Sequence, residues 1–171
     1  DGNLIAIAEC DEEDNAHGII SALGVLKEWK KRFELDYIAA INADYSTPYH
    51  EHDENRYVYF GTIGKLLPSF YVVGKETHVG QAYGGLDPNL LVAELTRLID
   101  LNPDLSDEAQ GEVTIPPVSL KQTDFKDSYT VQTAIAAYVY YNFFTHRMTP
   151  KDVMAAMKEK AVEAFDNVVE Y

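Results

Sequence analysis

The feature that most constrains the fold is an apolar run that ends in consecutive acids. Residues 4–8 (Leu-Ile-Ala-Ile-Ala) are too apolar to be solvated, which predicts a buried strand, and residues 9–15 (Glu-Cys-Asp-Glu-Glu-Asp-Asn) follow it directly. The carboxyl end of such a strand opens onto the crevice where α/β sheets bind ligands. If the side chains of Glu12 and Glu13 diverge, one can ligate a metal ion while the other moves a proton, as a metal hydrolase requires. The alternative is a solvated acidic loop in which Asp14 or Asn15 caps the next helix.

A helix and a second strand are predicted after these acids. Residues 37–43 read as another buried strand, so residues 4–43 form a predicted parallel β-α-β unit. Asp44 would then emerge at the same end of the sheet as Glu12 and Glu13, which favours a shared metal site. The helix is predicted over residues 16–33 from apolar side chains at steps of three and four: Ile19, Leu23, Leu26, Trp29 and Phe33.

Charge and cysteine content exclude several classes of function. The 171 residues include 28 acids and 14 basic residues, and a net charge of −14 argues against a surface that binds nucleic acid. The single Cys10 cannot form an intrachain disulfide, and no signal peptide or membrane-spanning run is visible. We therefore expect a cytoplasmic protein with no membrane partner. Because a buried-type strand starts almost at residue 1, we also expect the chain to be a fragment.

The character of the sequence changes after Pro48. Residues 49–55 are polar and without periodicity, so we predict a domain junction there, with the β-α-β unit in residues 1–48, a hinge over 49–56 and a second domain over 57–171. His50 and His52 alternate with acids in the hinge and would share a face if it were extended. They are candidates for a cation site, and a solvated hinge is the alternative reading.

The second domain begins with strands and a helix. Strands are predicted over 57–60 and 66–73, followed by a turn-rich segment over 74–85. A helix then opens with Asp87 as N-cap and Pro88 at its first position, and it stops at Asn102-Pro103. Its predicted buried stripe is Leu91, Leu95 and Leu98.

Two more strands and a last helix complete the pattern. Residues 112–122 read as a strand whose Pro116-Pro117 pair must sit at an edge or bulge, and residues 130–144 alternate as a strand would, although their Ala-rich middle would tolerate a helix. The order β-β-α-β-β-α predicts a ferredoxin-like or split β-α-β domain, with an antiparallel sheet and helices on one face. The last helix has Thr149 as cap, Pro150 at its first position, Asp152 completing a capping box, and a face of Val153, Met157, Ala161, Phe165 and Val168.

Several motifs together resemble a known enzyme family. Asp11-Glu12-Glu13 after one predicted strand, Asp44 after the next, and residues 74–80 (Gly-Lys-Glu-Thr-His-Val-Gly) followed by Gly85-Leu86-Asp87 resemble the dinuclear zinc exopeptidase and deacylase family. That family includes aminoacylases, carboxypeptidase G and dipeptidases. Residues 41–48, 50–55 and 119–122 are closely similar to a member concerned with arginine utilisation. The resemblance covers nearly the whole chain. It implies a fragment of the metal-carrying catalytic domain over residues 1–48 and an inserted α+β lid, or dimerisation domain, over residues 57–171.

The resemblance also implies roles for single residues. Glu12 would be the general base that deprotonates a metal-bridging water, Glu13 a ligand of one zinc ion and Asp44 a ligand of the other. His78 would be the lid histidine that reaches the active site of the partner subunit and polarises the scissile carbonyl. Without the resemblance, His78 reads as a turn histidine satisfied by local hydrogen bonds. Asp87 stands where the family often has a lid asparagine, but its N-cap role explains it fully.

The departures from the family pattern limit these expectations. The family's first metal histidine and bridging aspartate lie upstream of such a segment, and its last histidine lies after the lid; none is in this chain. Asp44 is also one methylene shorter than the usual glutamate. We therefore expect a catalytically inactive piece of a hydrolase of amide bonds in amino-acid derivatives or small peptides, with zinc, cobalt or manganese bound weakly at best. Two alternatives stay open: a non-catalytic dimerisation module that pairs with a second copy, and a small-molecule binding domain.

Overall fold

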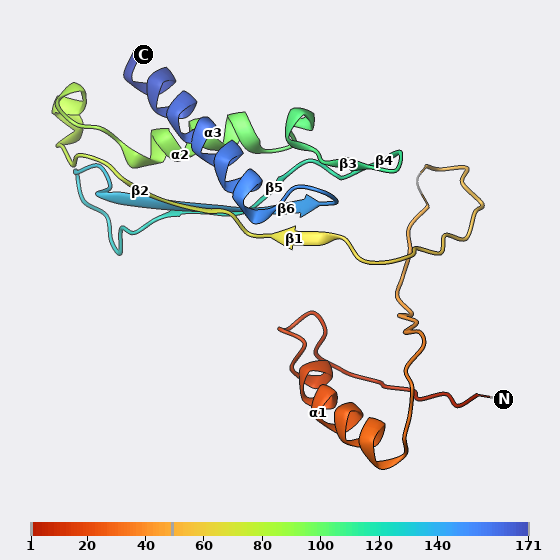
Figure 1. Cartoon of the computed structure of the whole chain (residues 1–171). Coiled ribbons are helices and arrows are strands. Elements are labelled where there is room, and N and C mark those ends of the chain that lie inside the picture. The colour runs from red at the N-terminus through yellow and green to blue at the C-terminus, as the bar shows by residue number, and fades with distance from the viewer. Residues whose placement is uncertain (1, 49, 171) are drawn as a thin grey trace. The chain divides into compact units, whose positions relative to one another are not determined.

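The computed structural model describes residues 2–48 and 50–170. The chain divides into two compact units, Asp1–Val58 and Tyr59–Tyr171 (Figure 1). We call them unit 1 and unit 2 and describe each by itself. The assignment of these units to a catalytic domain and a lid stays a prediction.

Unit 1 contains the predicted helix, α1 (His17–Arg32), but not the two predicted strands. Residues 4–8 and 37–43 have no strand pairing, and Leu4, Ile38 and Ile41 are 90%, 92% and 91% exposed. The predicted parallel β-α-β unit is therefore wrong for the described residues. Apolar periodicity indicates a segment that is suited to a sheet, whereas a strand forms only where a second strand satisfies its backbone N–H and C=O groups.

Unit 2 is built on an antiparallel sheet whose central strand is β6 (Ala136–Thr145). Strands β1 (Gly64–Leu66) and β2 (Ser69–Val73) pair with successive parts of β6 on one side, and β5 (Val118–Asp124) pairs with it on the other side. Between β1 and β2, the carbonyl of Pro68 accepts a hydrogen bond from the Tyr141 N–H at 3.1 Å. This continuity makes β1 and β2 two parts of one interrupted edge strand. The predicted strand over 130–144 is thus confirmed, although it starts later than expected.

The connection of these strands is that of a split β-α-β unit. Both β2 and β5 run antiparallel to β6, which lies between them, and helix α2 (Pro88–Ile99) connects β2 to β5. Helix α3 (Pro150–Glu170) follows β6, and both helices lie on the same side of the sheet (Figure 1). The predicted α+β architecture, an antiparallel sheet with helices on one face, is confirmed for unit 2.

The core lies between the sheet and the two helices. Alternate residues of β6 face the helices, and Val139, Tyr141 and Phe143 are all 0% exposed. Helix α2 contributes the predicted stripe of Leu91, Leu95 and Leu98, which are 7%, 3% and 8% exposed. Burial of these side chains supplies most of the stabilisation of unit 2, at about 1.5–3 kcal/mol for each large apolar side chain.

The ends of both helices follow their predicted capping signals. The Asp87 carboxylate accepts from the Asn89 N–H at 2.9 Å, with Pro88 at the first position of α2. At α3, Asp152 accepts from the Thr149 N–H at 2.8 Å, and the Asp152 N–H donates to Thr149 Oγ1 at 3.3 Å, which is a reciprocal capping box.

The predicted face of α3 is only partly right. Val153 and Met157 are buried, but Phe165 is 48% exposed and Ala164 takes the buried position beside it, at 1%. The packed stripe therefore shifts by one residue near the end of the helix. A side chain larger than alanine would not fit against the core at that point without displacing neighbours.

The segment between α2 and β5 differs from the single strand predicted over 112–122. A short 3₁₀ helix, η2 (Pro103–Leu105), leads into a hairpin of β3 (Glu108–Ala109) and β4 (Glu112–Val113), and Pro116-Pro117 separates β4 from β5. Proline lacks the N–H that a sheet ladder needs, so the strand is divided there. The strand predicted over 57–60 is wrong: these residues have no strand pairing.

A buried carboxylate connects the hairpin to the start of α3. Asp107 Oδ2 accepts from the N–H groups of His146, Arg147 and Met148 at 2.6–2.8 Å, and its Oδ1 accepts from the Glu108 N–H at 2.9 Å. Burial alone would raise the pKa of Asp107, but these four N–H groups outweigh it and lower the pKa from its usual 3.8. The carboxylate thus fixes the turn that leads from β6 into α3.

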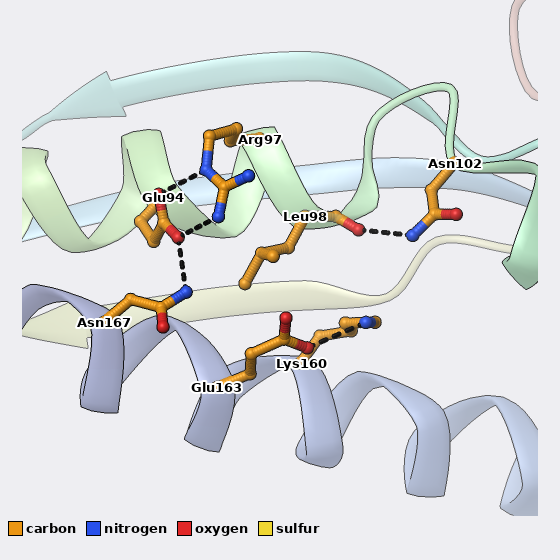
Figure 2. A network of polar contacts seen from close by, with 7 residues as sticks. All are labelled: Glu94, Arg97, Leu98, Asn102, Lys160, Glu163 and Asn167. Atoms are coloured by element: carbon orange, nitrogen blue, oxygen red, sulfur yellow. Dashed lines mark hydrogen bonds and ion pairs between the residues drawn. The ribbon is translucent and has the colours of Figure 1, made fainter.

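A polar network joins α2 to α3 on the outside of the helical layer (Figure 2). The Glu94 carboxylate accepts from Arg97 Nε and Nη2 at 2.8 and 2.6 Å and from Asn167 Nδ2 at 2.7 Å. The hydrogen bonds from Arg97 and then Asn167 lower the pKa of Glu94 to about 2.

Among the described residues, no helix is long and apolar enough to span a bilayer.

Candidate functional site

The acidic run opens α1 through Asp11. The Asp11 carboxylate accepts from the Gly18 N–H at 3.0 and 3.2 Å, and its carbonyl accepts from the N–H groups of Asp14 and Ala16. A Cβ on Gly18 would lie 2.8 Å from Asp11 Oδ1, so a larger residue at this position would force the carboxylate to move. Asp11 therefore satisfies a donor at the start of the helix.

This result corrects the predicted N-cap. Neither Asp14 nor Asn15 caps α1, because Asn15 and Ala16 both adopt left-handed conformations, with φ of 67° and 51°. The Asn15 side chain donates to Asp14 Oδ1 at 3.1 Å instead. The tolerance of asparagine for this conformation is a sequence signal for the turn, but it does not identify Asp11 as the residue that reaches back to the helix.

Glu12 and Glu13, the predicted base and ligand, lie in the turn between Asp11 and Asn15 and are exposed. Across residues 2–48 and 50–170, no hydrogen bond or ion pair is formed by either carboxylate. Within the acidic run, Asp11 is thus the residue whose carboxylate accepts a hydrogen bond from the start of α1. Glu12 and Glu13 keep their carboxylates available for chemistry or for solvent.

Asp44, the other predicted ligand, is also exposed and lies outside regular structure. Its Oδ1 accepts from the Tyr45 N–H at 2.6 Å. Because the two strands are not formed, the sheet edge that would bring Asp44 beside Glu12 and Glu13 is not formed either.

The described residues do not by themselves form a metal centre. Over residues 2–48 and 50–170, no three His, Cys, Asp or Glu side chains come close enough together to share an ion. This holds for the acids of unit 1 and for His50 and His52. Structural and catalytic zinc sites use at least three protein ligands, and the described residues bring no such set together.

His78, the predicted lid histidine, lies in unit 2 between β2 and α2. It is exposed and stands immediately before a short 3₁₀ segment, η1 (Val79–Gly84). Its Nδ1 accepts from the Gly80 N–H at 3.0 Å. Local hydrogen bonding of this kind was the alternative reading of His78, and it leaves Nε2 exposed.

The main chain around His78 is hydrogen-bonded to the extended residues 131–133. The Val79 N–H donates to the Val131 carbonyl and the Thr133 N–H donates to the Thr77 carbonyl, both at 2.9 Å. An isolated antiparallel bridge pairs His78 with Gln132. The main chain at His78 is therefore fixed on both sides.

A shallow hollow lies elsewhere in unit 2, between α2 and α3. It is lined by Leu90, Ala93, Glu94, Arg97, Asn167 and Val168. Its charged side chains are already paired with one another (Figure 2), so the hollow is explained by helix packing. None of the predicted site residues lines it.

Comparison with known proteins identifies two relatives that match nearly all of the chain. It is 42% identical over 163 residues to Protein RocB of Bacillus subtilis, a match that covers 95% of this chain and 29% of RocB. It is 37% identical over 169 residues to the uncharacterised protein YqjN of the same organism, covering 99% of this chain and 31% of YqjN. No family model and no solved structure matches. The chain thus spans about three tenths of the length of these relatives.

Proposed function

We propose that this chain is part of a larger metal-dependent hydrolase that cleaves amide bonds of amino-acid derivatives or small peptides, in the setting of arginine utilisation. The proposal extends the similarity to RocB with the motif resemblance of Asp11-Glu12-Glu13, Asp44 and His78. Unit 1 would supply part of the catalytic domain and unit 2 the lid. The chain alone is expected to be inactive.

The observation that best supports this proposal is the division of roles within the acidic run. A run that served only to open a helix would need one carboxylate, and Asp11 already fills that role. Glu12 and Glu13 are then exposed acids whose carboxylates form no hydrogen bond or ion pair with the described residues, beside the start of a helix. Glu12 is proposed as the general base and Glu13 as a metal ligand, with Asp44 as a second ligand.

Zinc binding provides the test. We would titrate zinc calorimetrically into this chain and into the full-length parent, in the wild type and in Glu12→Gln, Glu13→Gln and Asp44→Asn. Tight binding only in the parent, weakened in Glu13→Gln and Asp44→Asn but kept in Glu12→Gln, would support the roles. An equal absence of binding in both proteins would reject the hydrolase.

Measurements of turnover distinguish the proposed general base, Glu12, from the proposed metal ligands. With zinc or cobalt added, the parent should hydrolyse N-acetyl amino acids or dipeptides, and Glu12→Gln should lower kcat by about 10²–10⁴-fold while zinc binding is kept. Glu9→Gln, in the same run but without a proposed role, is the matched control. Turnover by the 171-residue chain alone would contradict the proposal that it is an inactive part.

A second candidate function is homodimerisation through unit 2. Within the part of the chain that the structure describes, the outer edge of β5 pairs with no strand, and exposed edges of this kind pair readily with a second copy. Light scattering coupled to size exclusion would give a dimer mass at micromolar concentration. Gln122→Pro, which removes an N–H that points away from β6, should then yield a monomer, whereas a monomer in the wild type would reject the association module for this chain.

A further inference from the structure

The histidine in the turn between β2 and α2 has one ring nitrogen engaged and one exposed. Gly80 N–H donates to His78 Nδ1 at 3.0 Å. A ring nitrogen that accepts a hydrogen bond carries no proton, and a neutral imidazole carries one proton on the other nitrogen. The neutral ring at His78 therefore has its N–H at Nε2.

The main chain around the donor is closed into a compact turn. The Gln81 N–H donates to the His78 carbonyl at 2.7 Å, and Thr77 Oγ1 donates to the Gln81 carbonyl at 3.0 Å. Together with the bonds to residues 131–133, these contacts fix the direction of the Gly80 N–H. The imidazole is consequently oriented by the backbone and not by packing.

Glycine at position 80 leaves room for the ring beside its amide. A Cβ built on Gly80 would lie 3.2 Å from His78 Nδ1 and 3.5 Å from Cε1. The first distance is shorter than an ordinary van der Waals contact, so a side chain at position 80 would push the ring away by a few tenths of an ångström.

We propose that Gly80 is a positioning residue that fixes the tautomer of His78, so that the ring N–H lies at Nε2 and is presented to an acceptor oxygen of a bound ligand. The proton assignment rests on the hydrogen bond alone, whereas the identity of the acceptor, the carbonyl oxygen of an amide, rests on the proposed function. With Nδ1 engaged and Nε2 protonated, the neutral ring has no lone pair left for a metal ion or for use as a base. A fixed donor aimed at a developing oxyanion is the arrangement that accelerates acyl transfer.

Nuclear magnetic resonance of the ¹⁵N-labelled 171-residue chain tests the proton assignment. We expect a scalar coupling between the Gly80 amide nitrogen and His78 Nδ1, with ring ¹⁵N shifts of a pure Nε2–H tautomer. His17, whose ring has no hydrogen bond to a described residue, is the internal reference for tautomer averaging. Absence of the coupling, or averaging at His78 equal to that at His17, would overturn the role of Gly80.

Two variants distinguish a role of His78 as hydrogen-bond donor to the ligand from a role that only stabilises the turn. His78→Asn keeps an acceptor oxygen near the position of Nδ1 but lacks the distal N–H. We expect its Gly80 amide to remain protected from hydrogen exchange, while kcat of the full-length parent with zinc and N-acetyl amino acids falls by about 10²–10³-fold at nearly constant KM. Gly80→Ala keeps the N–H but displaces the ring, so it should lose the coupling and lower kcat by about tenfold. Glu76→Gln, exposed in the same loop, is the control expected to change neither.

The outcomes distinguish this inference from the proposed function. Wild-type turnover retained in His78→Asn would overturn the donor role even if the coupling is observed. A parent that hydrolyses no amide would reject the proposed function, and the coupling would still decide whether Gly80 fixes the tautomer.

Discussion

Units 1 and 2 carry similar apolar segments but differ completely in burial. No described residue of unit 1 is buried, and its apolar runs contain Ile38 and Ile41 at 92% and 91% exposure. The central strand of unit 2 has comparable content, and its Val139 and Phe143 are 0% exposed. The difference lies in pairing: β6 has a strand on each side and two helices over one face, whereas residues 37–43 have neither. A hydrophobic pattern therefore specifies a surface to be buried, but not what buries it.

Hydrogen exchange should show the largest contrast between the units. Amides of β6 are expected to exchange only through global unfolding of unit 2, with protection of at least about 10³-fold if its stability is about 5 kcal/mol. Amides of residues 4–8 and 37–43 should exchange at nearly the rate of an unstructured peptide. Comparable protection in the two units would contradict this difference between them, because it would require strand pairing in unit 1.

A matched pair of core and surface truncations should show the next largest effect. Phe143→Ala removes a fully buried side chain and should lower the free energy of unfolding of unit 2 by about 3–5 kcal/mol. Ile41→Ala, at 91% exposure, should change stability by no more than about 0.5 kcal/mol. Urea unfolding followed by circular dichroism measures both. A large cost for Ile41→Ala would reveal a buried environment in unit 1.

The buried carboxylate of unit 2 offers a smaller, pH-dependent test. Asp107→Asn should destabilise unit 2 by about 2–3 kcal/mol at neutral pH, because charge-assisted hydrogen bonds from backbone N–H groups are weakened. Since the folded-state pKa is lowered from 3.8, the charged form contributes stability above pH 3.8 and loses it as the pH falls toward the lowered pKa. The difference in Tm between variant and wild type should therefore shrink on acidification. Asp127→Asn, at an exposed position, is the control; a pH-independent difference would count against the carboxylate as the cause.

The link between α2 and α3 should give the smallest effect. Asn167→Ala removes one hydrogen bond to Glu94 at a partly exposed site and should cost about 0.5–1 kcal/mol. The Glu94 pKa, held at about 2, should rise in the variant, because one of the two groups that lower it is gone. Titration of the Glu94 carboxyl by nuclear magnetic resonance measures the change. Asn167→Asp should raise this pKa further, and an unchanged value in both variants would contradict the network in Figure 2.

Local signals in the sequence predicted the helices of unit 2 well. Asp87 with Pro88 and Thr149 with Asp152 are capping patterns in which every partner lies within three residues. The alternation along β6 likewise predicted a strand despite its alanines. These features succeed because the physical cause and the sequence pattern span the same few residues.

The features that the sequence did not predict depend on partners that lie far away along the chain. Asp107 receives hydrogen bonds from residues about forty positions later, so no short window of sequence reveals it. The strands over 4–8 and 37–43 depend on partners that the apolar pattern does not contain. For the candidate site, the roles of Glu12 as base and Glu13 as ligand stay predictions. The sequence did not reveal that Asp11 would accept from the start of α1 or that the Gly80 N–H would donate to His78.

The central position of β6 has a consequence for biosynthesis. In the described chain, β1, β2 and β5 each find their strand partner in β6, which is the last strand to be translated. Until the ribosome has produced residues 136–145, β1, β2 and β5 have no strand partner and helix α2 has no sheet to cover. Nascent chains that end before residue 136 are therefore expected to depend on chaperones. A ribosome stalled at that point would present the most aggregation-prone form of the protein.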